Sequence, residues 1–222
     1  MRTVWVMGAC GFATLGAVVV LAPEALGQHR GVPAQSPAAL SGIEQALQQS
    51  FPDRLLPEPR QAWRARLAQD EIMRVCSQFR NKPPKRVATT IQRIVRAGLV
   101  LPADGIAGGD WRRGEAIAQD GAGQRFTDSG PERPNGGNCY ACHQLSPAEA
   151  AHGTLGPNLS GYGKLHEFSP ATARKVYEHI WNPHMHTPCS SMPRFGASAT
   201  LTPDQIRDLV ALVMARESPV NR

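Results

Sequence analysis

The 222-residue sequence contains one Cys-x-x-Cys pair, Cys139 and Cys142, and has no second pair that could complete a four-thiolate zinc site. Its 24 Lys and Arg residues are scattered, with no aromatic-basic module and no helix-turn-helix pattern, so we expect no nucleic-acid partner. We interpret the net charge of +6 mainly as a solvated basic surface that can steer acidic partners. The sequence also lacks a convincing nucleophile, and we assign no catalytic residue to it.

The one cysteine pair is followed directly by His143, which completes a Cys-x-x-Cys-His motif. In this spacing each thiol adds across one vinyl group of a porphyrin, and the histidine lies under the iron as an axial ligand. The position of the histidine favours haem over a redox dithiol or half of a zinc site. We predict one covalently attached haem c, bound through Cys139 and Cys142.

The N-terminus has the organisation of a signal peptide. Arg2 precedes an apolar run from Val4 to Leu21, and Ala25-Leu26-Gly27 has the small-x-small pattern that precedes a cleavage site. We predict cleavage before Gln28 and export to the periplasm, with no membrane span left in the mature chain. Because the run is close to spanning length, an uncleaved anchor is the alternative.

Five cysteines are present, and the predicted roles account for three of them. Cys10 would be removed with the signal peptide, and two cysteines carry the haem. Cys76 and Cys189 remain, and in an oxidising compartment two such thiols most often form a disulfide. Two separate buried thiols are the alternative.

The rest of the chain divides into three parts. Residues 28–59 are rich in Pro, Ala, Ser and Gln and indicate a flexible leader, with a possible short helix at Ser41–Gln49. Residues 60–108 form a helical extension, and residues 109–222 form the haem domain. We read no strand of consequence and predict an all-α fold. Helices are expected at Trp63–Phe79, around Val87–Gly98, within Asp110–Gln119, from about Pro170 to Trp181, and after Thr202.

The second axial ligand is assigned to Met192. Pro193 would stiffen its loop, and Phe195 can pack on the porphyrin, whereas Met185 lies in a polar stretch whose sulfur is less suited to an apolar pocket. Met/His ligation is common in electron-transfer cytochromes c. The other candidates, interpreted as core or surface residues, are Met73, Met214, His152, His166, His179, His184 and His186.

Met/His ligation would leave no open coordination position on the iron. This favours electron transfer over ligand sensing, oxygen activation or peroxidase chemistry. Arg194, beside the ligand loop, can contact a haem propionate or face solvent.

Several segments together resemble class I cytochrome c: a helix with a small residue, the Cys-x-x-Cys-His motif, Gly156-Pro157-Asn158-Leu159, a later methionine loop and a closing amphipathic helix. Within that family, Gly137–His143 and Cys189–Gly196 are similar to SoxX, the mono-haem subunit of the SoxAX complex of thiosulfate oxidation. The resemblance runs from about Trp63 to the C-terminus, and the Cys-x-x-Met-Pro-Arg-Phe-Gly segment is its most specific part.

The resemblance implies a class I cytochrome c fold with an N-terminal helical extension, and a carbonyl of Pro157 that holds the second ring nitrogen of His143. It also implies a heterodimer with SoxA, whose haem and cysteine would form the catalytic centre. The pair would join thiosulfate oxidatively to a cysteine of the carrier SoxYZ, as an L-cysteine S-thiosulfotransferase, with electrons leaving through this chain to a downstream acceptor. A free-standing periplasmic cytochrome that shuttles electrons to an oxidase is the alternative.

Overall fold

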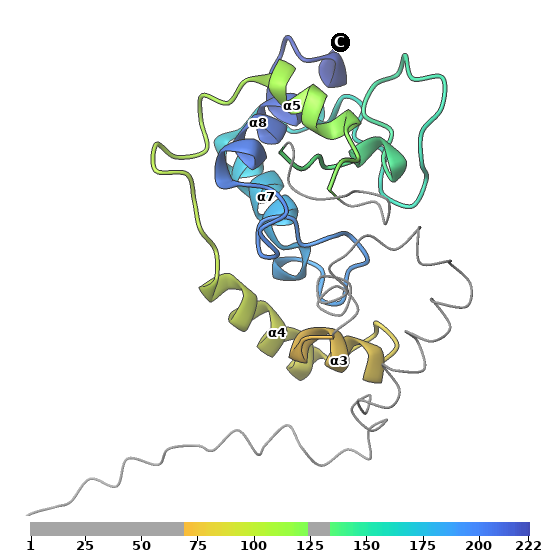
Figure 1. Ribbon diagram of the computed structural model, residues 1–222, viewed down its shortest axis with the longest axis vertical. Helices are drawn as coiled ribbons and strands as arrows, with labels where there is room; N and C mark the ends of the chain where they lie inside the picture. The colour runs from red at the N-terminus through yellow and green to blue at the C-terminus, as the bar shows by residue number, and fades with distance from the viewer. Residues whose placement is uncertain (1–68, 124–133) are drawn as a thin grey trace, which may run out of the picture. The chain divides into compact units, whose positions relative to one another are not determined.

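The computed structural model describes residues 69–123 and 134–222, and these residues form helices joined by loops, with no strand among them (Figure 1). The predicted all-α fold is therefore correct. The predicted signal peptide and leader, the short helix at Ser41–Gln49 and the first residues of the helix predicted at Trp63–Phe79 lie outside the described residues. The described part of that last prediction is helical only over Glu71–Gln78, because Asp70 acts as the N-cap. None of the helices within the described ranges has the length and hydropathy needed to cross a bilayer.

The haem domain is built on three longer helices, α5 (Trp111–Gln119), α7 (Pro170–Trp181) and α8 (Pro203–Met214). Helix α7 begins where Ser169 accepts a hydrogen bond from the Thr172 amide and places Pro170 in the first turn. Helix α8 begins with the predicted capping box between Thr202 and Gln205. These starts follow the sequence because a local side chain satisfies the free amides of each first turn.

Helix α5 packs closely against α8, as Figure 1 shows. Gly114 makes this approach possible, since a Cβ there would collide with the backbone carbonyl of Asp208. Arg113 fixes the pair further, because its Nε donates to Asp208 Oδ2 at 2.7 Å, and the Asp110 amide donates to Asp208 Oδ1 at 2.8 Å. A glycine and a buried carboxylate therefore set the spacing of these two helices.

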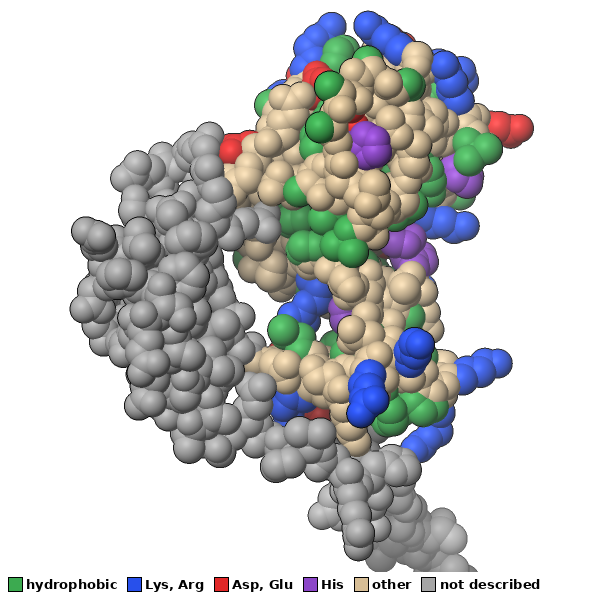
Figure 2. Space-filling view, turned by 90° about the vertical axis from the view of Figure 1, so that its right-hand side faces the viewer, with side chains coloured by type: hydrophobic (Ala, Val, Ile, Leu, Met, Phe, Trp, Pro, Cys, Tyr) green, Lys and Arg blue, Asp and Glu red, His purple; other side chains and the backbone are tan. Residues whose placement is uncertain are grey.

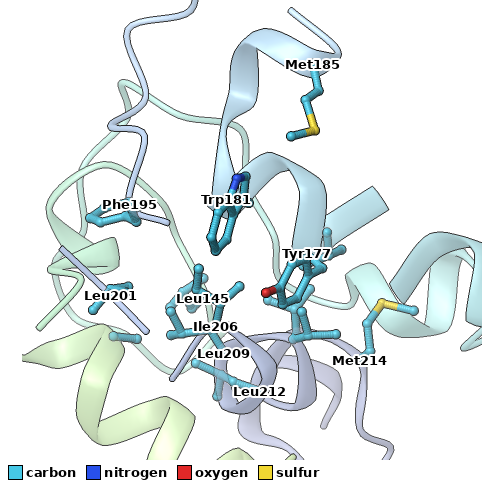
Figure 3. Close-up of a cluster of buried hydrophobic side chains, with 14 of the residues drawn as sticks. Leu145, Tyr177, Trp181, Met185, Phe195, Leu201, Ile206, Leu209, Leu212 and Met214 are labelled. Carbon is cyan, nitrogen blue, oxygen red and sulfur yellow. The ribbon is translucent and has the colours of Figure 1, made fainter. Parts of the chain in front are cut away.

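The main hydrophobic core lies between α7, α8 and the loops around them. Figure 3 shows Trp181 and Tyr177 of α7 directed toward the leucines and the isoleucine of this core, with Phe195 and Leu201 beside them. The Tyr177 side chain is fully buried, and its hydroxyl donates to the Val100 carbonyl at 2.8 Å. The fully buried leucines and isoleucine are Leu145, Leu201, Ile206, Leu209 and Leu212.

The extension forms a helical hairpin of α3 (Glu71–Gln78) and α4 (Lys85–Ala97). Asp70 caps α3 by accepting from the Met73 amide at 2.8 Å. Cys76 is the buried residue of α3, and Ile91 and Val95 are those of α4. With so little apolar surface buried, the hairpin depends on its attachments to the haem domain.

The described residues also form one short α-helix and three 3-10 helices: α6 (Tyr162–Leu165), η3 (Cys139–Ala141), η4 (Pro183–Met185) and η5 (Pro219–Asn221). The Asn221 side chain, almost fully buried, donates to the carbonyls of Val213 and Ala215 at 2.9 Å each. This anchors the C-terminus against the end of α8.

Candidate haem site

The Cys-x-x-Cys-His motif lies in a tight turn at the end of α5. Asn138 adopts left-handed backbone angles (φ 46°, ψ 42°) and leads into η3, in which the amides of Cys142 and His143 both donate to the Cys139 carbonyl. The preceding Gly137 amide donates to the Ile117 carbonyl of α5 at 2.8 Å. The motif is thus held on the structure that α5 and α8 form.

Both motif cysteines carry free thiols and are partly buried. Burial raises the pKa of the Cys139 thiol to about 12, so this thiol is protonated at neutral pH. A protonated, disulfide-free pair is the form that can be converted to two thioethers.

The imidazole of His143 is oriented by the loop that contains Pro157. The carbonyl of Pro157 lies 2.8 Å from Nδ1 and can only accept, so Nδ1 carries the proton and the lone pair is on Nε2. Gly156 lies against the ring, because a Cβ there would be 2.5 Å from Nδ1. The Gly156 amide donates to the Cys142 carbonyl at 2.8 Å and joins this loop to the motif. This arrangement leaves Nε2 available as an iron ligand.

Trp181 provides an independent test of whether these residues fit a haem. Its Nε1 is buried, and no residue in the described ranges accepts a hydrogen bond from it. A buried donor without an acceptor is rare in folded proteins and calls for a partner. A haem propionate is an anionic acceptor of the required kind, and the apolar residues around Trp181 suit a porphyrin. The site fits the group.

Gly196 shows how closely the methionine loop approaches this tryptophan. A Cβ on Gly196 would collide with the Trp181 ring, and the amides of Gly196 and Ala197 both donate to the Trp181 carbonyl. The neighbouring Phe195 is 5% exposed and belongs to the core, a position consistent with its predicted role beside the porphyrin. Sequence reasoning did not select Trp181, although a Trp at the end of a core helix was a visible signal.

Met192 is partly buried and packs against the core, and it also lines a pocket of about 270 Å³ beside α3. His184, Met73 and the Cys76–Cys189 disulfide line the same pocket. The disulfide confirms the pairing predicted from the cysteine count. Cys189 has positive φ (63°), an uncommon conformation for a residue other than glycine. The ligand loop is thereby tied covalently to the extension.

The burial of Met185 differs from the expectation based on its polar neighbours in the sequence. Its side chain is completely buried, although polar residues flank it, so its sulfur does lie in an apolar environment. The surrounding polar groups are satisfied internally: His186 Nε2 lies 2.8 Å from Glu178 Oε2, and the Cys189 amide donates to His184 Nδ1 at 3.4 Å. Met214 is buried in the core as expected. The choice between Met192 and Met185 stays a prediction.

Arg194 contacts the extension. Its Nη1 donates to the Asp70 carboxylate, and its Nη2 lies 3.2 Å from the Met73 sulfur. Burial alone would raise the pKa of Asp70, but the Met73 amide and Arg194 together hold it below its ordinary value. Arg194 therefore joins the methionine loop to α3, and the propionate contact predicted for it stays a prediction.

The sequence matches the cytochrome c family over residues 107–216. It is also 36% identical over 160 residues to an uncharacterized lipoprotein of Aquifex aeolicus (strain VF5), an alignment that spans 72% of this chain and 76% of that protein. The motif geometry and the family match indicate one covalently attached haem c and an electron-transfer role. On these grounds the chain belongs to the cytochrome c family.

Proposed function

We propose that this cytochrome is the electron-accepting subunit of a SoxAX complex, which oxidatively conjugates thiosulfate to a cysteine of the carrier SoxYZ. The observation that carries the proposal is the Cys189–Gly196 segment, which resembles SoxX and is joined by a disulfide to a helical extension. A minimal single-haem cytochrome has no need of such an extension. The partner SoxA would supply the catalytic cysteine, since this chain offers no nucleophile of its own.

When bound, the haem supplies one-electron transfer between ferric and ferrous iron. The residues of this chain have supporting roles. His143, held by Pro157, presents Nε2 to the metal, and the apolar residues around Trp181 exclude water from the group. We propose Met192 as the second residue that would hold the iron, where its thioether would favour the reduced state and make the haem an electron acceptor.

The ligand assignment is tested by two single variants. Met192→Ala should abolish the weak near-infrared sulfur–iron absorption of the ferric protein and open the iron to added imidazole. Met185→Ala is the matched control, because it removes a methionine from the same part of the chain. Met185 is fully buried and Met192 is partly buried. If Met185→Ala loses the band and Met192→Ala keeps it, the assignment is wrong.

The complex itself is tested by isolation from the native source. We expect this chain to co-purify with a second haem polypeptide, and thiosulfate-dependent electron transfer to require both chains. The His143→Ala variant should be inactive in that assay. A monomeric chain whose deletion leaves thiosulfate oxidation intact would support the alternative of a free-standing electron shuttle.

We further propose that the protein is exported and acts in the periplasm. The signal-like N-terminus supports export, as does the description of the Aquifex relative as a lipoprotein. Mass determination of the mature chain should show an N-terminus at Gln28. Retention of residues 1–27 would indicate an anchor, and a lipid-modified N-terminus at Cys10 would indicate a lipoprotein.

A further inference from the structure

The positive charge of the protein is concentrated on the hairpin of α3 and α4. Between residues 70 and 97 there are seven Lys and Arg residues and two acidic residues, so this segment carries +5 of the net charge of +6. Residues 98–222 contain 11 Lys and Arg and 12 Asp and Glu residues, and their net charge is −1. The haem domain is thus close to neutral before its haem propionates are counted.

The basic side chains of the hairpin are exposed, and most have no acidic partner among the residues that the structure describes. Arg74 pairs with Glu71, and Arg96 reaches Glu178 at 4.0 Å and the Met185 carbonyl at 2.7 Å. In residues 69–123 and 134–222 no carboxylate forms an ion pair with the remaining five. These five, here called the hairpin cations, are Arg80, Lys82, Lys85, Arg86 and Arg93.

In the haem domain, most of the described cations have a carboxylate or aromatic partner. Arg113, Arg174 and Arg207 each form an ion pair with a nearby carboxylate. Arg112 and Arg216 lie over the rings of Trp111 and Phe168, respectively. Lys164 and Lys175 are also exposed, so in the described ranges the cations with neither a carboxylate nor an aromatic partner number five on the hairpin and two on the haem domain. Figure 2 shows Lys and Arg side chains projecting from the lower part of the described surface, at the level of α3 and α4 in Figure 1.

Helical geometry places the cations of α4 on one side. At about 100° per residue, Lys85, Arg86, Arg93 and Arg96 lie within an arc of about 100°. The buried Ile91 and Val95 occupy the opposite side and belong to the hydrophobic core cluster. Arg96, within this arc, contacts the Met185 carbonyl, whereas Lys85, Arg86 and Arg93 are exposed and form no ion pair with a carboxylate of the described residues.

Apolar side chains are exposed on α4 and just after it. Ile94 on α4 is 49% exposed, and Val100 and Leu101, just after the helix, are 53% and 38% exposed. A lipid surface takes up both kinds of side chain, because its phosphates attract cations and its headgroup region accepts isolated apolar residues. A protein interface is a poorer match, since charged residues are depleted at interface cores, which favour aromatic side chains, and none of the exposed large hydrophobic residues here is aromatic.

We propose that the α3–α4 hairpin is a docking surface for an anionic lipid bilayer. The disulfide from Cys76 to Cys189 and the Arg194–Asp70 contact hold α3 on the haem domain, so docking would fix the orientation of the haem at the membrane. The inference does not depend on the role in thiosulfate oxidation. It requires only that the protein meets a bilayer surface, as an exported protein does.

The test measures co-sedimentation of the processed, haem-loaded protein with vesicles. We expect binding to vesicles of equal parts phosphatidylglycerol and phosphatidylcholine at low salt, and no binding to pure phosphatidylcholine. Binding should be lost in about 1 M NaCl, where the screening length falls to about 3 Å. Equal binding to both vesicle types would indicate a retained apolar N-terminus and would overturn the proposal.

Two triple variants with the same change in net charge locate the surface. Lys85→Gln/Arg86→Gln/Arg93→Gln should weaken binding about 100-fold, since each cation near an anionic surface contributes about fivefold. Arg112→Gln/Lys175→Gln/Arg216→Gln removes three exposed cations of the haem domain and should change binding by less than about threefold. Circular dichroism and the haem spectrum should be unchanged in both. Equal losses in the two variants, or a wild-type protein that ignores anionic vesicles, would overturn the proposal and leave an acidic protein as the candidate partner.

Discussion

The hairpin and the haem domain of this cytochrome are stabilised in different ways. In the haem domain, α5 and α8 touch backbone to backbone through Gly114, and α7 adds large buried side chains such as Tyr177 and Trp181. In the hairpin, three side chains are buried, and the attachments are one disulfide and a few polar contacts. A small element with little core needs a covalent link to keep its place, whereas a domain with continuous packing does not.

The polar attachments of the hairpin converge on the segment that contains Met185, Met192 and Arg194. Gln92 and Arg96 both donate to the Met185 carbonyl, at 3.3 and 2.7 Å, and Arg194 of the loop binds Asp70 before α3. Hairpin and ligand loop are therefore coupled, and disturbance of one should be detectable in the other.

The largest effect is expected from removal of the disulfide. The Cys76→Ser/Cys189→Ser variant should lose up to about 4–5 kcal/mol of unfolding free energy, the chain-entropy value for a link across a long loop. The linked residues are 113 positions apart. Denaturant unfolding followed by haem absorption measures the loss.

Hydrogen exchange shows where that loss is located. Beyond the global loss, α3 and α4 should open locally in the variant, so their amides should lose more protection than those of α5 and α8. Uniformly faster exchange across all four helices would show that the hairpin and the haem domain unfold as one unit, contrary to the contrast drawn here.

Glycine substitutions give the next largest difference. Gly114→Ala should destabilise the protein by about 3 kcal/mol, because the new methyl group collides with the Asp208 carbonyl and forces α5 away from α8. Gly98→Ala, at the end of α4, is the control. Its nearest neighbour would be the Val95 carbonyl at 3.7 Å, so a change within about 1 kcal/mol is expected. Similar midpoints for the two variants would refute the close contact.

One ion pair in each region can be removed, and the losses of unfolding free energy can then be compared. Asp208→Asn should cost about 2 kcal/mol at neutral pH, because it removes a charged partner of Arg113 and of the Asp110 amide. Asp70→Asn should cost less than about 1 kcal/mol, because that pair is half-exposed. Chemical denaturation of both variants beside the wild type supplies the values.

The pH dependence of these two effects has a defined sign. Burial would raise the pKa of Asp208, but its hydrogen bonds with Arg113 and the Asp110 amide hold it below 3.8, and the pKa of Asp70 is also lowered. Each carboxylate therefore stabilises the fold fully above its ordinary pKa and loses this effect as the pH falls through its lower folded pKa. The difference between wild type and each variant should shrink in strong acid. A difference that grows there would contradict the sign.

The smallest effect concerns two histidines where the hairpin meets the ligand loop. Burial lowers the pKa of His186 and of His184 below 6.5, so folding favours their neutral forms. Their contribution is present above pH 6.5 and is lost as the pH falls below it through the folded values. His186→Gln should make the unfolding free energy less sensitive to pH between about 7 and 5, by less than about 1 kcal/mol. His166 is exposed, and His166→Gln is the control. An equal change in the pH dependence of that variant would show that the effect is not specific to His186.

Local sequence signals predicted a good part of this structure. The starts of α7 and α8 followed from Ser169-Pro170 and from the Thr202 capping box, because a cap acts within one helical turn. The Cys76–Cys189 pairing followed from counting, since the haem motif used two of the other cysteines. The haem motif itself is contiguous and needed no tertiary information.

Features that depend on distant partners could not be predicted in this way. The burial of Met185 was missed because its histidine neighbours are satisfied by Glu178 and by the Cys189 amide, contacts that local polarity does not reveal. The Arg194–Asp70 contact joins residues 124 positions apart. Trp181 becomes notable only when its Nε1 is seen to be buried without an acceptor among the described residues.

The disulfide also has a topological consequence. The chain from Cys76 to Cys189 is a closed covalent ring that carries both haem-binding cysteines. One proteolytic cut between Ser77 and Pro188 would open this ring without releasing a fragment, and the haem would remain attached to the whole. Two bands should separate on a denaturing gel only after a reductant is added, and haem staining should mark the one that contains Cys139 and Cys142.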